Sequence, residues 1–190
     1  MKYAVVTGST KGIGKAIAEK FLQEDFFVFV NYNRDDEACE KFKSDNKQYS
    51  GKFEVIKEDL SSYENAQSFI EKIKEKTNSI DALVLNCGVT DRSKFEDISK
   101  ESWEHVMNVN VNVPFYLVQG FKSMIVESGS VVFVGSTLGK FPHATSLSYG
   151  VTKAAIQSMA KNLVKFFEDK AVTVNAVAPG FVETEWQKNI

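Results

Sequence analysis

The sequence Thr7-Gly8-Ser9-Thr10-Lys11-Gly12-Ile13-Gly14 decides the fold of this 190-residue chain. An apolar, β-branched run at residues 3–7 leads straight into it, and a helical pattern opens directly behind it. Gly8 lets the chain turn sharply off the strand, Gly12 lets the backbone approach a pyrophosphate, and Gly14 lets helix and strand pack closely. A tight turn alone would also use glycines. Three of them between a first strand and a helix predict a phosphate site at the helix N-terminus.

Strand-like and helix-like segments alternate along the rest of the chain. The predicted strands are residues 3–7, 26–32, 53–56, 82–86, 131–134 and 172–177. Between them, Ile13, Ile17 and Phe21 recur every four residues, and residues 149–167 are long enough for several helical turns. The run Ala82-Leu83-Val84-Leu85 is apolar at every position, which suits a strand covered on both faces. We expect an α/β fold with a doubly wound parallel sheet in three layers (Rossmann-like), and residues 1–190 forming a single dinucleotide-binding domain.

The composition argues against several classes of protein. The chain has 23 Lys and Arg against 25 Asp and Glu, spread along its length, so no region offers the concentrated basic face that nucleic-acid binding needs. No stretch approaches membrane-spanning length, and the start lacks a signal-peptide pattern. Cys39 and Cys87 are too few for a disulfide framework and lack the spacing of a zinc site. We expect a cytoplasmic protein with free thiols, no metal, and neither nucleic acid nor membrane as a partner.

The end of the second predicted strand, Val30-Asn31-Tyr32-Asn33-Arg34, indicates which dinucleotide binds. An acidic residue there would accept hydrogen bonds from the 2′-hydroxyl of NAD and repel the 2′-phosphate of NADP. Asn31 stands where such an acid would sit, and Lys11 and Arg34 can reach the same pocket. Charge-assisted hydrogen bonds to the extra phosphate therefore favour NADP(H). Two aspartates follow directly, so NAD(H) stays open as the second choice, and Arg34 could instead be a solvated loop charge.

Tyr149, Lys153 and Ser136 carry the pattern of a proton-transfer site. Tyr149 and Lys153 are four residues apart in a helical pattern, so they share one helix face. An adjacent ammonium, together with a positive nicotinamide ring, favours the phenolate and would bring the pKa of Tyr149 down from about 10 toward the working range. Ser136 follows the strand at 131–134 and can stabilise charge on a carbonyl oxygen. Alone, the Tyr-x-x-x-Lys spacing is common on exposed helices, and Ser136 could be a helix cap.

These motifs occur together and in order along the chain. They are Thr7-Gly8-x-x-x-Gly12-Ile13-Gly14, Asn86-Cys87-Gly88, Asn110, Ser136, Tyr149 with Lys153, and Pro179-Gly180. The chain resembles the short-chain dehydrogenase/reductase family over residues 1–186, and most of all its 3-oxoacyl-[acyl-carrier-protein] reductases. The resemblance implies an NADPH-dependent enzyme of fatty acid biosynthesis that reduces a ketone, here a 3-oxoacyl thioester, to a secondary alcohol.

The resemblance also implies a role for each matching position. Ser136, Tyr149 and Lys153 would form the catalytic set, and Asn110 would kink its helix and hold a water that links the lysine to bulk solvent. The positions expected to bind the cofactor are Gly8, Thr10, Lys11, Gly12, Ile13, Gly14, Asn31 and Arg34; Asp59 and Leu60 beside the adenine; Asn86 and Gly88 beside its ribose; and Tyr149, Lys153, Pro179, Gly180 and Thr184 toward the nicotinamide. His105 and His143 match no family position, and we expect surface or packing roles for both.

The sequence departs from the family pattern in two places. The usual Asn-Ala-Gly reads Asn86-Cys87-Gly88, which puts a thiol beside the cofactor at little expected cost. Family members usually continue well past Thr184 into a substrate-covering lid and a last strand, whereas this sequence stops at Ile190. We therefore expect either a piece of a longer chain, or a truncated form with an open site and a weakened oligomer interface.

Substrate and class of function stay open. Glu127, in Met124-Ile125-Val126-Glu127-Ser128-Gly129, would repel an acidic carrier protein, so a sugar, polyol or other small-alcohol dehydrogenase is an alternative to an acyl-thioester reductase. In either case the partner is a small-molecule carbonyl or acyl-thioester substrate. A non-catalytic dinucleotide-sensing protein is the alternative of another class, although such a protein has no chemical need for a facing phenol and ammonium.

The resemblance further implies a homodimer or homotetramer. The family assembles through helices that match residues 99–121 and 148–167. Both stretches hold apolar residues that we expect to bury a further face against a second subunit. These are Val106, Val109 and Val113 in the first stretch, and Val151, Ala155 and Met159 in the second.

Overall fold

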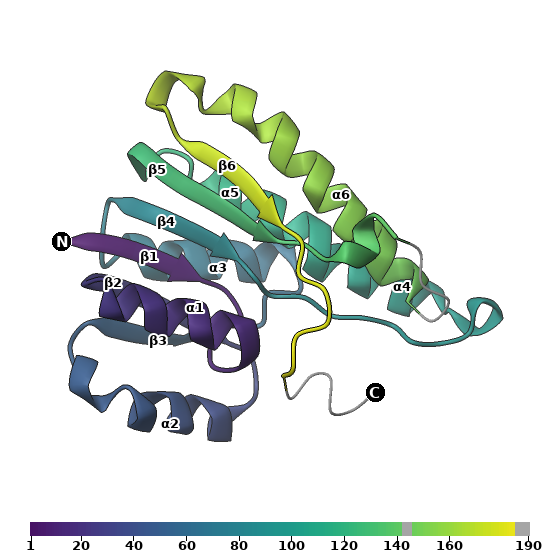
Figure 1. Cartoon of the computed structure of the whole chain (residues 1–190), viewed down its shortest axis with the longest axis horizontal. Coiled ribbons are helices and arrows are strands. Elements are labelled where there is room, and N and C mark those ends of the chain that lie inside the picture. Colours follow the sequence, from purple (N-terminus) through teal and green to yellow (C-terminus); the bar gives the residue numbers. More distant parts are fainter. Residues whose placement is uncertain (142–145, 185–190) are drawn as a thin grey trace.

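The computed structural model describes residues 1–141 and 146–184, which form a six-stranded parallel sheet with helices on both faces (Figure 1). The strands are β1 Lys2–Val6, β2 Phe26–Tyr32, β3 Phe53–Lys57, β4 Ile80–Leu85, β5 Ile125–Val134 and β6 Thr173–Val177. The helices are α1 Gly12–Gln23, α2 Asp36–Asp45, α3 Tyr63–Lys74, α4 Lys100–Met107, α5 Val113–Phe121 and α6 Leu147–Leu163. The predicted doubly wound α/β fold is confirmed, and so is each of the six predicted strands.

The strand order β3-β2-β1-β4-β5-β6 places the phosphate turn at the middle of the sheet. β1 pairs with β2 on one side and with β4 on the other, so the chain winds outward in both directions from β1. In such sheets the loops after the two central strands diverge, and they leave a crevice at the carboxyl ends of the strands. The glycine turn follows β1 and Asn86 follows β4. The topology therefore brings the two sequence motifs to the same edge of the sheet.

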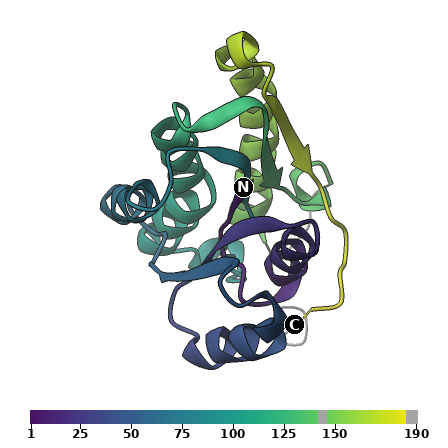
Figure 2. The ribbon, with the colours of Figure 1, turned by 90° about the vertical axis from the view of Figure 1, so that its left-hand side faces the viewer.

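Alternate strand residues feed two separate hydrophobic cores. On β1, Val5 packs into the core shared with α3, α5 and α6, whereas Ala4 and Val6 pack into the core shared with α1 and α2. The same alternation runs through β2, where Phe29 faces the first core and Val28 and Val30 face the second. Figure 2 shows the two helical layers on either side of the sheet. Strands buried on both faces explain why their sequences are apolar at every position.

β5 begins earlier than predicted because a bulge interrupts it. Its pairing with β4 shifts register between Ile80 and Ala82, and Ser128 has a positive φ of 60°. The residues around Ser128 read as a turn, and the strand accommodates them as a bulge before it continues to Val134. The composition predicted only residues 131–134 of β5, which follow the bulge.

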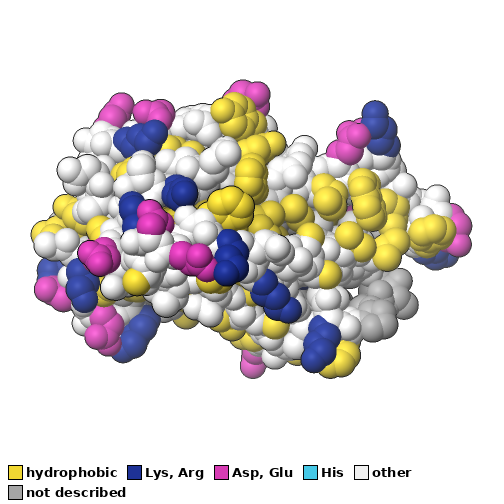
Figure 3. All heavy atoms as spheres, turned by 90° about the horizontal axis from the view of Figure 1, so that it is seen from above, with side chains coloured by type: hydrophobic (Ala, Val, Ile, Leu, Met, Phe, Trp, Pro, Cys, Tyr) yellow, Lys and Arg dark blue, Asp and Glu magenta, His cyan; other side chains and the backbone are white. Residues whose placement is uncertain are grey.

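One prediction about assembly is wrong for the first helical stretch. Val106, Val109 and Val113 are buried within the chain itself, so they cannot also bury a face against a second subunit. On α6, Val151 is 41% exposed. Figure 3 views the molecule from the side on which α6 lies and shows hydrophobic side chains gathered along that face. Within the described residues, no helix combines the length and apolar character needed to cross a bilayer.

Candidate active site

The glycine turn leaves the N-terminus of α1 open to an anion. Gly8 and Gly12 have positive φ values of 60° and 57°. The N-cap of α1, Lys11, makes no side-chain cap hydrogen bond, and the first turn holds no acidic residue. Among the described residues, a Cβ added at Gly12 would meet only the side chain of Thr184 within 4 Å, at 3.7 Å. Because the first backbone N–H groups of a helix lack intrahelical partners, this end fits the pyrophosphate of a dinucleotide.

Asn31 supports this turn from beneath and does not face the cofactor pocket. Its side chain is buried, its Oδ1 accepts a hydrogen bond from the Gly8 N–H at 3.1 Å, and its Nδ2 donates to the carbonyls of Ile56 at 3.4 Å and Glu58 at 3.1 Å. The amide is therefore not available to a 2′-phosphate. Asn31 was expected among the cofactor-binding positions, but its amide holds strands and turn together, so its contribution to cofactor binding is to support the glycine turn.

The charged residues around the expected ribose are arranged in pairs. Lys11 Nζ lies 2.6 Å from Asp35 Oδ2, and Asp35 Oδ1 accepts from the Ala38 N–H at 3.0 Å as the N-cap of α2. Asp36 accepts hydrogen bonds from Lys57 at 2.7 Å and from the Tyr32 hydroxyl at 2.8 Å. The hydrogen bond from Lys11 lowers the pKa of Asp35, and that from Lys57 lowers the pKa of Asp36. Both acids already have cationic partners.

A groove of about 1180 Å³ runs from this end of the turn along α1. Thr10, Lys11, Asp35 and Thr184 are among the residues that line it. Arg34 is exposed at its neighbouring loop, and no hydrogen bond or ion pair of its side chain occurs among residues 1–141 and 146–184. The Asp35 carboxylate is therefore paired with Lys11, whereas the Arg34 guanidinium is available to bind an anion.

On the adenine side, the predicted positions differ in what they present. Asp59 is exposed, whereas the Leu60 side chain is 3% exposed and packs in the core with Phe29. A contact between Leu60 and the adenine would have to come from its backbone. Asn86 Nδ2 donates to the carbonyls of Thr7 at 3.0 Å and Gly8 at 2.9 Å, so Asn86 ties the end of β4 to the glycine turn.

Ser136, Tyr149 and Lys153 meet at the carboxyl end of β5. Each is at least nine-tenths buried. The Ser136 hydroxyl accepts from the Leu138 N–H at 3.1 Å, and its interaction with the Tyr149 phenol lowers the pKa of that phenol. Lys153 Nζ lies 5.2 Å from the centroid of the Tyr149 ring and donates to the Val134 carbonyl at 2.7 Å. The three predicted catalytic side chains are thus brought together.

The turn that carries Ser136 is pressed against α6. A Cβ added at Gly139 would lie 2.7 Å from the backbone carbonyl carbon of Lys153, so only glycine allows this approach. Gln157 Nε2 donates to the Ser136 carbonyl at 2.8 Å, and the Thr137 N–H donates to the Pro179 carbonyl at 3.0 Å. These contacts place Pro179, which begins the Pro-Gly motif, directly beside the serine turn.

Asn110 and Gly88 connect the catalytic set to the glycine turn. A Cβ added at Gly88 would lie 3.4 Å from both Lys153 Nζ and Asn110 Oδ1. Asn110 accepts from the Val89 N–H and donates to the Val89 carbonyl, each at 2.8 Å, and also donates to Thr152 Oγ1 at 3.0 Å. It lies in a π-helical turn, Asn108–Asn112, that interrupts α4 and α5. A π-helical turn is present at Asn110, while the kink of the helix and the water relay stay predictions.

Burial sets the proton affinities of the catalytic side chains. It lowers the pKa of Lys153 from 10.5 to about 8. It raises the pKa of Tyr149, and the hydrogen bond from Ser136 only partly opposes it. Tyr149 is therefore a protonated phenol at neutral pH, ready to donate. The ammonium lies over the tyrosine ring, 5.2 Å from its centroid. The lowering of the Tyr149 pKa that we expect from Lys153 together with a bound nicotinamide ring stays a prediction.

Cys87 shows how a thiol is tolerated beside this site. Burial raises the pKa of the Cys87 thiol to about 11, so it is neutral at physiological pH. Cys39 and Cys87 are both free, as predicted. His105 is exposed on α4, in agreement with a surface role, and His143 lies outside the described residues.

The family to which this arrangement belongs follows from comparison with known proteins. The family model described as short chain dehydrogenase matches residues 2–190. This chain belongs to the short-chain dehydrogenase family. Glucose 1-dehydrogenase 2 of Bacillus subtilis is 33% identical to it over 188 residues, which are 97% of this chain and 73% of that protein. The 3-oxoacyl-[acyl-carrier-protein] reductase FabG of Aquifex aeolicus is 34% identical over 186 residues, which are 97% of this chain and 75% of that protein.

Solved structures of short-chain dehydrogenases agree with the fold. The Pseudomonas aeruginosa RhlG/NADP active-site complex superposes with a TM-score of 0.91 at 29% identity, covering 100% of this chain and 76% of that one. The predicted family is confirmed by these comparisons.

Two supporting residues of this short-chain dehydrogenase were not predicted. Thr152 bridges the site, because its hydroxyl accepts from Asn110 and donates to the Tyr149 carbonyl at 2.8 Å. Glu58 ties the adenine-side loop to α3, because its carboxylate accepts hydrogen bonds from that helix. Nothing in either local sequence signals these roles, since a threonine in a helix and an acid after a strand are common surface residues.

Proposed function

We propose that this chain reduces a ketone to a secondary alcohol with NADPH. The observation that carries the proposal is the meeting of Ser136, Tyr149 and Lys153 beside a glycine turn that is open to a pyrophosphate. A protonated, buried phenol hydrogen-bonded to a hydroxyl suits proton donation to a carbonyl oxygen. These three side chains would have no shared chemical task in a protein that only binds the dinucleotide.

Each side chain then has a defined task in the reduction. A reduced nicotinamide, when bound, would supply the hydride for the carbonyl carbon. The Ser136 hydroxyl hydrogen-bonds the carbonyl oxygen, and Tyr149 gives that oxygen its phenolic proton. Lys153, held in place by the Val134 carbonyl, offsets the negative charge left on the phenol. Asn110, next to Lys153, stands where a water could return the proton.

The charges near the ribose support NADPH as the cofactor. Asp35 and Asp36, the acids that left NAD(H) open, are both paired with lysines, which offsets the negative charge that would otherwise repel a 2′-phosphate. Arg34 is exposed at the same loop. A guanidinium pairs well with a phosphate. The similar RhlG structure was solved as a complex with NADP.

Replacing Arg34 tests this choice of cofactor. We expect Arg34→Ala to weaken NADPH binding by about tenfold to a hundredfold and to leave NADH binding within about twofold, because a charge-assisted hydrogen bond is lost only for the phosphorylated ribose. Titration of each nucleotide by fluorescence measures both constants. Lys47→Ala removes the same charge from an exposed turn beyond α2 and serves as the control. An equal loss for the two nucleotides in Arg34→Ala would contradict the assignment.

The substrate we favour is a 3-oxoacyl thioester, with a sugar or polyol as the alternative. Relatives named FabG and glucose 1-dehydrogenase are about equally similar to the chain. Glu127 lies before Ser130, and the extended residues from Ser130 to Ser136 alone span roughly 20 Å. Its charge is therefore largely screened by salt at the catalytic serine.

A panel of carbonyl compounds tests the proposed function. Purified protein, NADPH and either an acetoacetyl thioester, simple ketones or ketoses are mixed, and loss of reduced nicotinamide is followed at its absorbance maximum. We expect oxidation that depends on the carbonyl compound and is fastest with the thioester. Fastest turnover of a ketose, or of glucose with NADP in the reverse direction, would identify the sugar dehydrogenase instead. NADPH binding without oxidation by any carbonyl would identify a sensing protein.

The pH dependence of reduction follows from the lowered pKa of Lys153. Lys153 is cationic below about pH 8 and neutral above, whereas burial raises the pKa of Tyr149 above its ordinary value, so Tyr149 keeps its proton where Lys153 loses one. We expect kcat/KM for ketone reduction to be level up to about pH 8 and then to fall by up to about tenfold per pH unit. In Lys153→Arg, whose side chain stays charged, residual activity should not fall near pH 8. A wild-type profile that stays level to pH 10 would exclude Lys153 from the proton-transfer step.

We also propose that the chain assembles as a homodimer or homotetramer through the apolar face of α6 shown in Figure 3. Leu147 and Val151, on the first turns of α6, are 43% and 41% exposed. Apolar area of this kind is stabilised by burial in a symmetric interface.

A further inference from the structure

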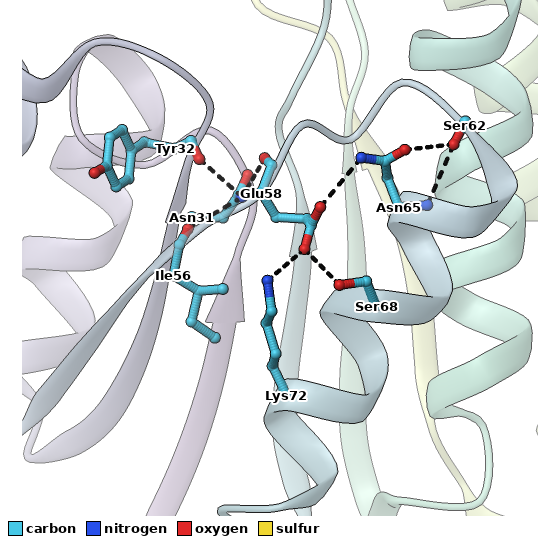
Figure 4. A network of polar contacts seen from close by, with 8 residues as sticks. All are labelled: Asn31, Tyr32, Ile56, Glu58, Ser62, Asn65, Ser68 and Lys72. Atoms are coloured by element: carbon cyan, nitrogen blue, oxygen red, sulfur yellow. Dashed lines mark hydrogen bonds and ion pairs between the residues drawn. The ribbon is translucent and has the colours of Figure 1, made fainter.

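A buried carboxylate outside the catalytic set lies beside the adenine end of the site. Glu58 follows β3 and directly precedes Asp59. Its side chain is only 10% exposed, and it accepts hydrogen bonds from Asn65 Nδ2 at 3.1 Å, Ser68 Oγ at 2.7 Å and Lys72 Nζ at 2.6 Å. All three donors come from α3. Figure 4 shows them converging on the one carboxylate, which joins the loop after β3 to α3.

The backbone of Glu58 continues this connection into the glycine turn. Its N–H donates to the Tyr32 carbonyl at 2.9 Å, and its carbonyl accepts from Asn31 Nδ2 at 3.1 Å. Asn31 in turn accepts from the Gly8 N–H at 3.1 Å. Figure 4 shows Asn31 reaching the peptide of Glu58 while the carboxylate points toward α3. A continuous hydrogen-bonded path therefore runs from α3 through Glu58 and Asn31 to Gly8.

The donors around Glu58 keep it charged and fully engaged. Burial alone would raise the pKa of Glu58, but hydrogen bonds from Lys72, Ser68 and Asn65 outweigh it and leave the pKa below its ordinary value. A carboxylate with three donors is rigidly held. Glu54 offers a contrast at the other end of β3, because it forms an ion pair with Lys76 at 3.2 Å with 36% of its side chain exposed.

We propose that Glu58 is a positioning residue for dinucleotide binding, which fixes the loop that carries Asp59 to α3 and, through Asn31, fixes the backbone of the glycine turn. This role rests on the proposed function, in which the loop and the glycine turn bind the dinucleotide. Glu58 touches neither substrate nor reacting atoms, so its loss should affect binding of the dinucleotide and leave the chemical step nearly unchanged.

Glu58→Ala, Glu58→Gln and the control Glu54→Ala test the proposal. Two measurements are made on each full-length variant: nucleotide titration with turnover, and amide hydrogen exchange of residues 8–10 and 59–61 in the protein without nucleotide. We expect Glu58→Ala to raise the Kd for NADPH about tenfold, to keep kcat within about twofold and to speed exchange of the Gly8 amide about tenfold. Glu58→Gln, which keeps an acceptor for the donors of α3, should recover most of both effects.

The control decides between positioning and general stability. Glu54→Ala removes an ion pair between the same strand and the end of α3, and should change neither the Kd nor the exchange of Gly8. Equal behaviour of Glu58→Ala and Glu54→Ala in both measurements would overturn the proposal. A wild-type protein that binds no dinucleotide would overturn the proposed function instead. In that event the Gly8 exchange rates still decide whether Glu58 fixes the turn.

Discussion

Tyr149→Phe should abolish measurable ketone reduction, with a loss of roughly 10²- to 10⁴-fold or more in kcat, while NADPH affinity stays within about twofold. The change removes one oxygen atom, which is the proposed proton donor, and keeps the aromatic ring under Lys153. The glycine turn is untouched, and at most one hydroxyl contact near the nicotinamide is lost, so nucleotide affinity should change little. Steady-state kinetics with the best substrate of the carbonyl panel, together with fluorescence titration of NADPH, measures both quantities.

A matched change on another tyrosine controls for loss of a hydroxyl. Tyr63→Phe alters a residue at the start of α3 that is 49% exposed, and it should leave kcat unchanged. If Tyr149→Phe retained wild-type kcat, Tyr149 could not be the acid, and the assignment of the catalytic set would have to be abandoned.

Gly14→Ala should have the second largest effect, because the added methyl has no room. Its Cβ would lie 2.3 Å from the Gly8 carbonyl oxygen and 2.5 Å from Asn86 Nδ2. Backbone and side chain must both shift, which separates α1 from β1 at the point where the pyrophosphate is expected to bind. We expect the free energy of unfolding to fall by about 3 kcal/mol and NADPH binding to weaken by more than about a hundredfold.

Gly51→Ala provides the control for Gly14→Ala. Gly51 has a φ of 83°, and no atom of residues 1–141 or 146–184 lies within 4 Å of an added Cβ, so the substitution costs only the strain of a left-handed residue, about 1 kcal/mol. NADPH binding should be unaffected. Denaturant unfolding gives the stability of both variants, and nucleotide titration gives the affinity. Tight NADPH binding by Gly14→Ala would show that close packing of α1 on β1 is not needed for the site.

The sequence predicted the architecture well because each signal was local. The apolar run Ala82-Leu83-Val84-Leu85 and the glycine turn depend on nearest neighbours and on burial, which composition reports directly. The bulge at Ser128 escaped prediction since turn residues within a strand resemble a loop end. Likewise, apolar spacing cannot distinguish an internal core from an interface, which is why Val106 was assigned to the wrong one.

The candidate site was predicted in its parts but not in how the parts are held. Tyr149 and Lys153 fall on one helix face by spacing alone, and Ser136 by its position after a strand. The direction of the Asn31 side chain could not be predicted, because it depends on the Ile56 and Glu58 carbonyls of another strand. Such long-range hydrogen bonds leave no periodic trace in a sequence.

Transfer of deuterium from NADPH that carries two deuterium atoms at nicotinamide C4 to an acetoacetyl thioester tests the central claim most directly, because either face of the ring then delivers a label. Product is analysed by mass spectrometry after a single turnover of the wild-type protein and of Tyr149→Phe. We predict one deuterium on the carbinol carbon for each NADPH oxidised by the wild-type protein, and no labelled alcohol from Tyr149→Phe. Bound NADPH that yields no labelled alcohol from the thioester or from any other carbonyl of the panel would contradict the account.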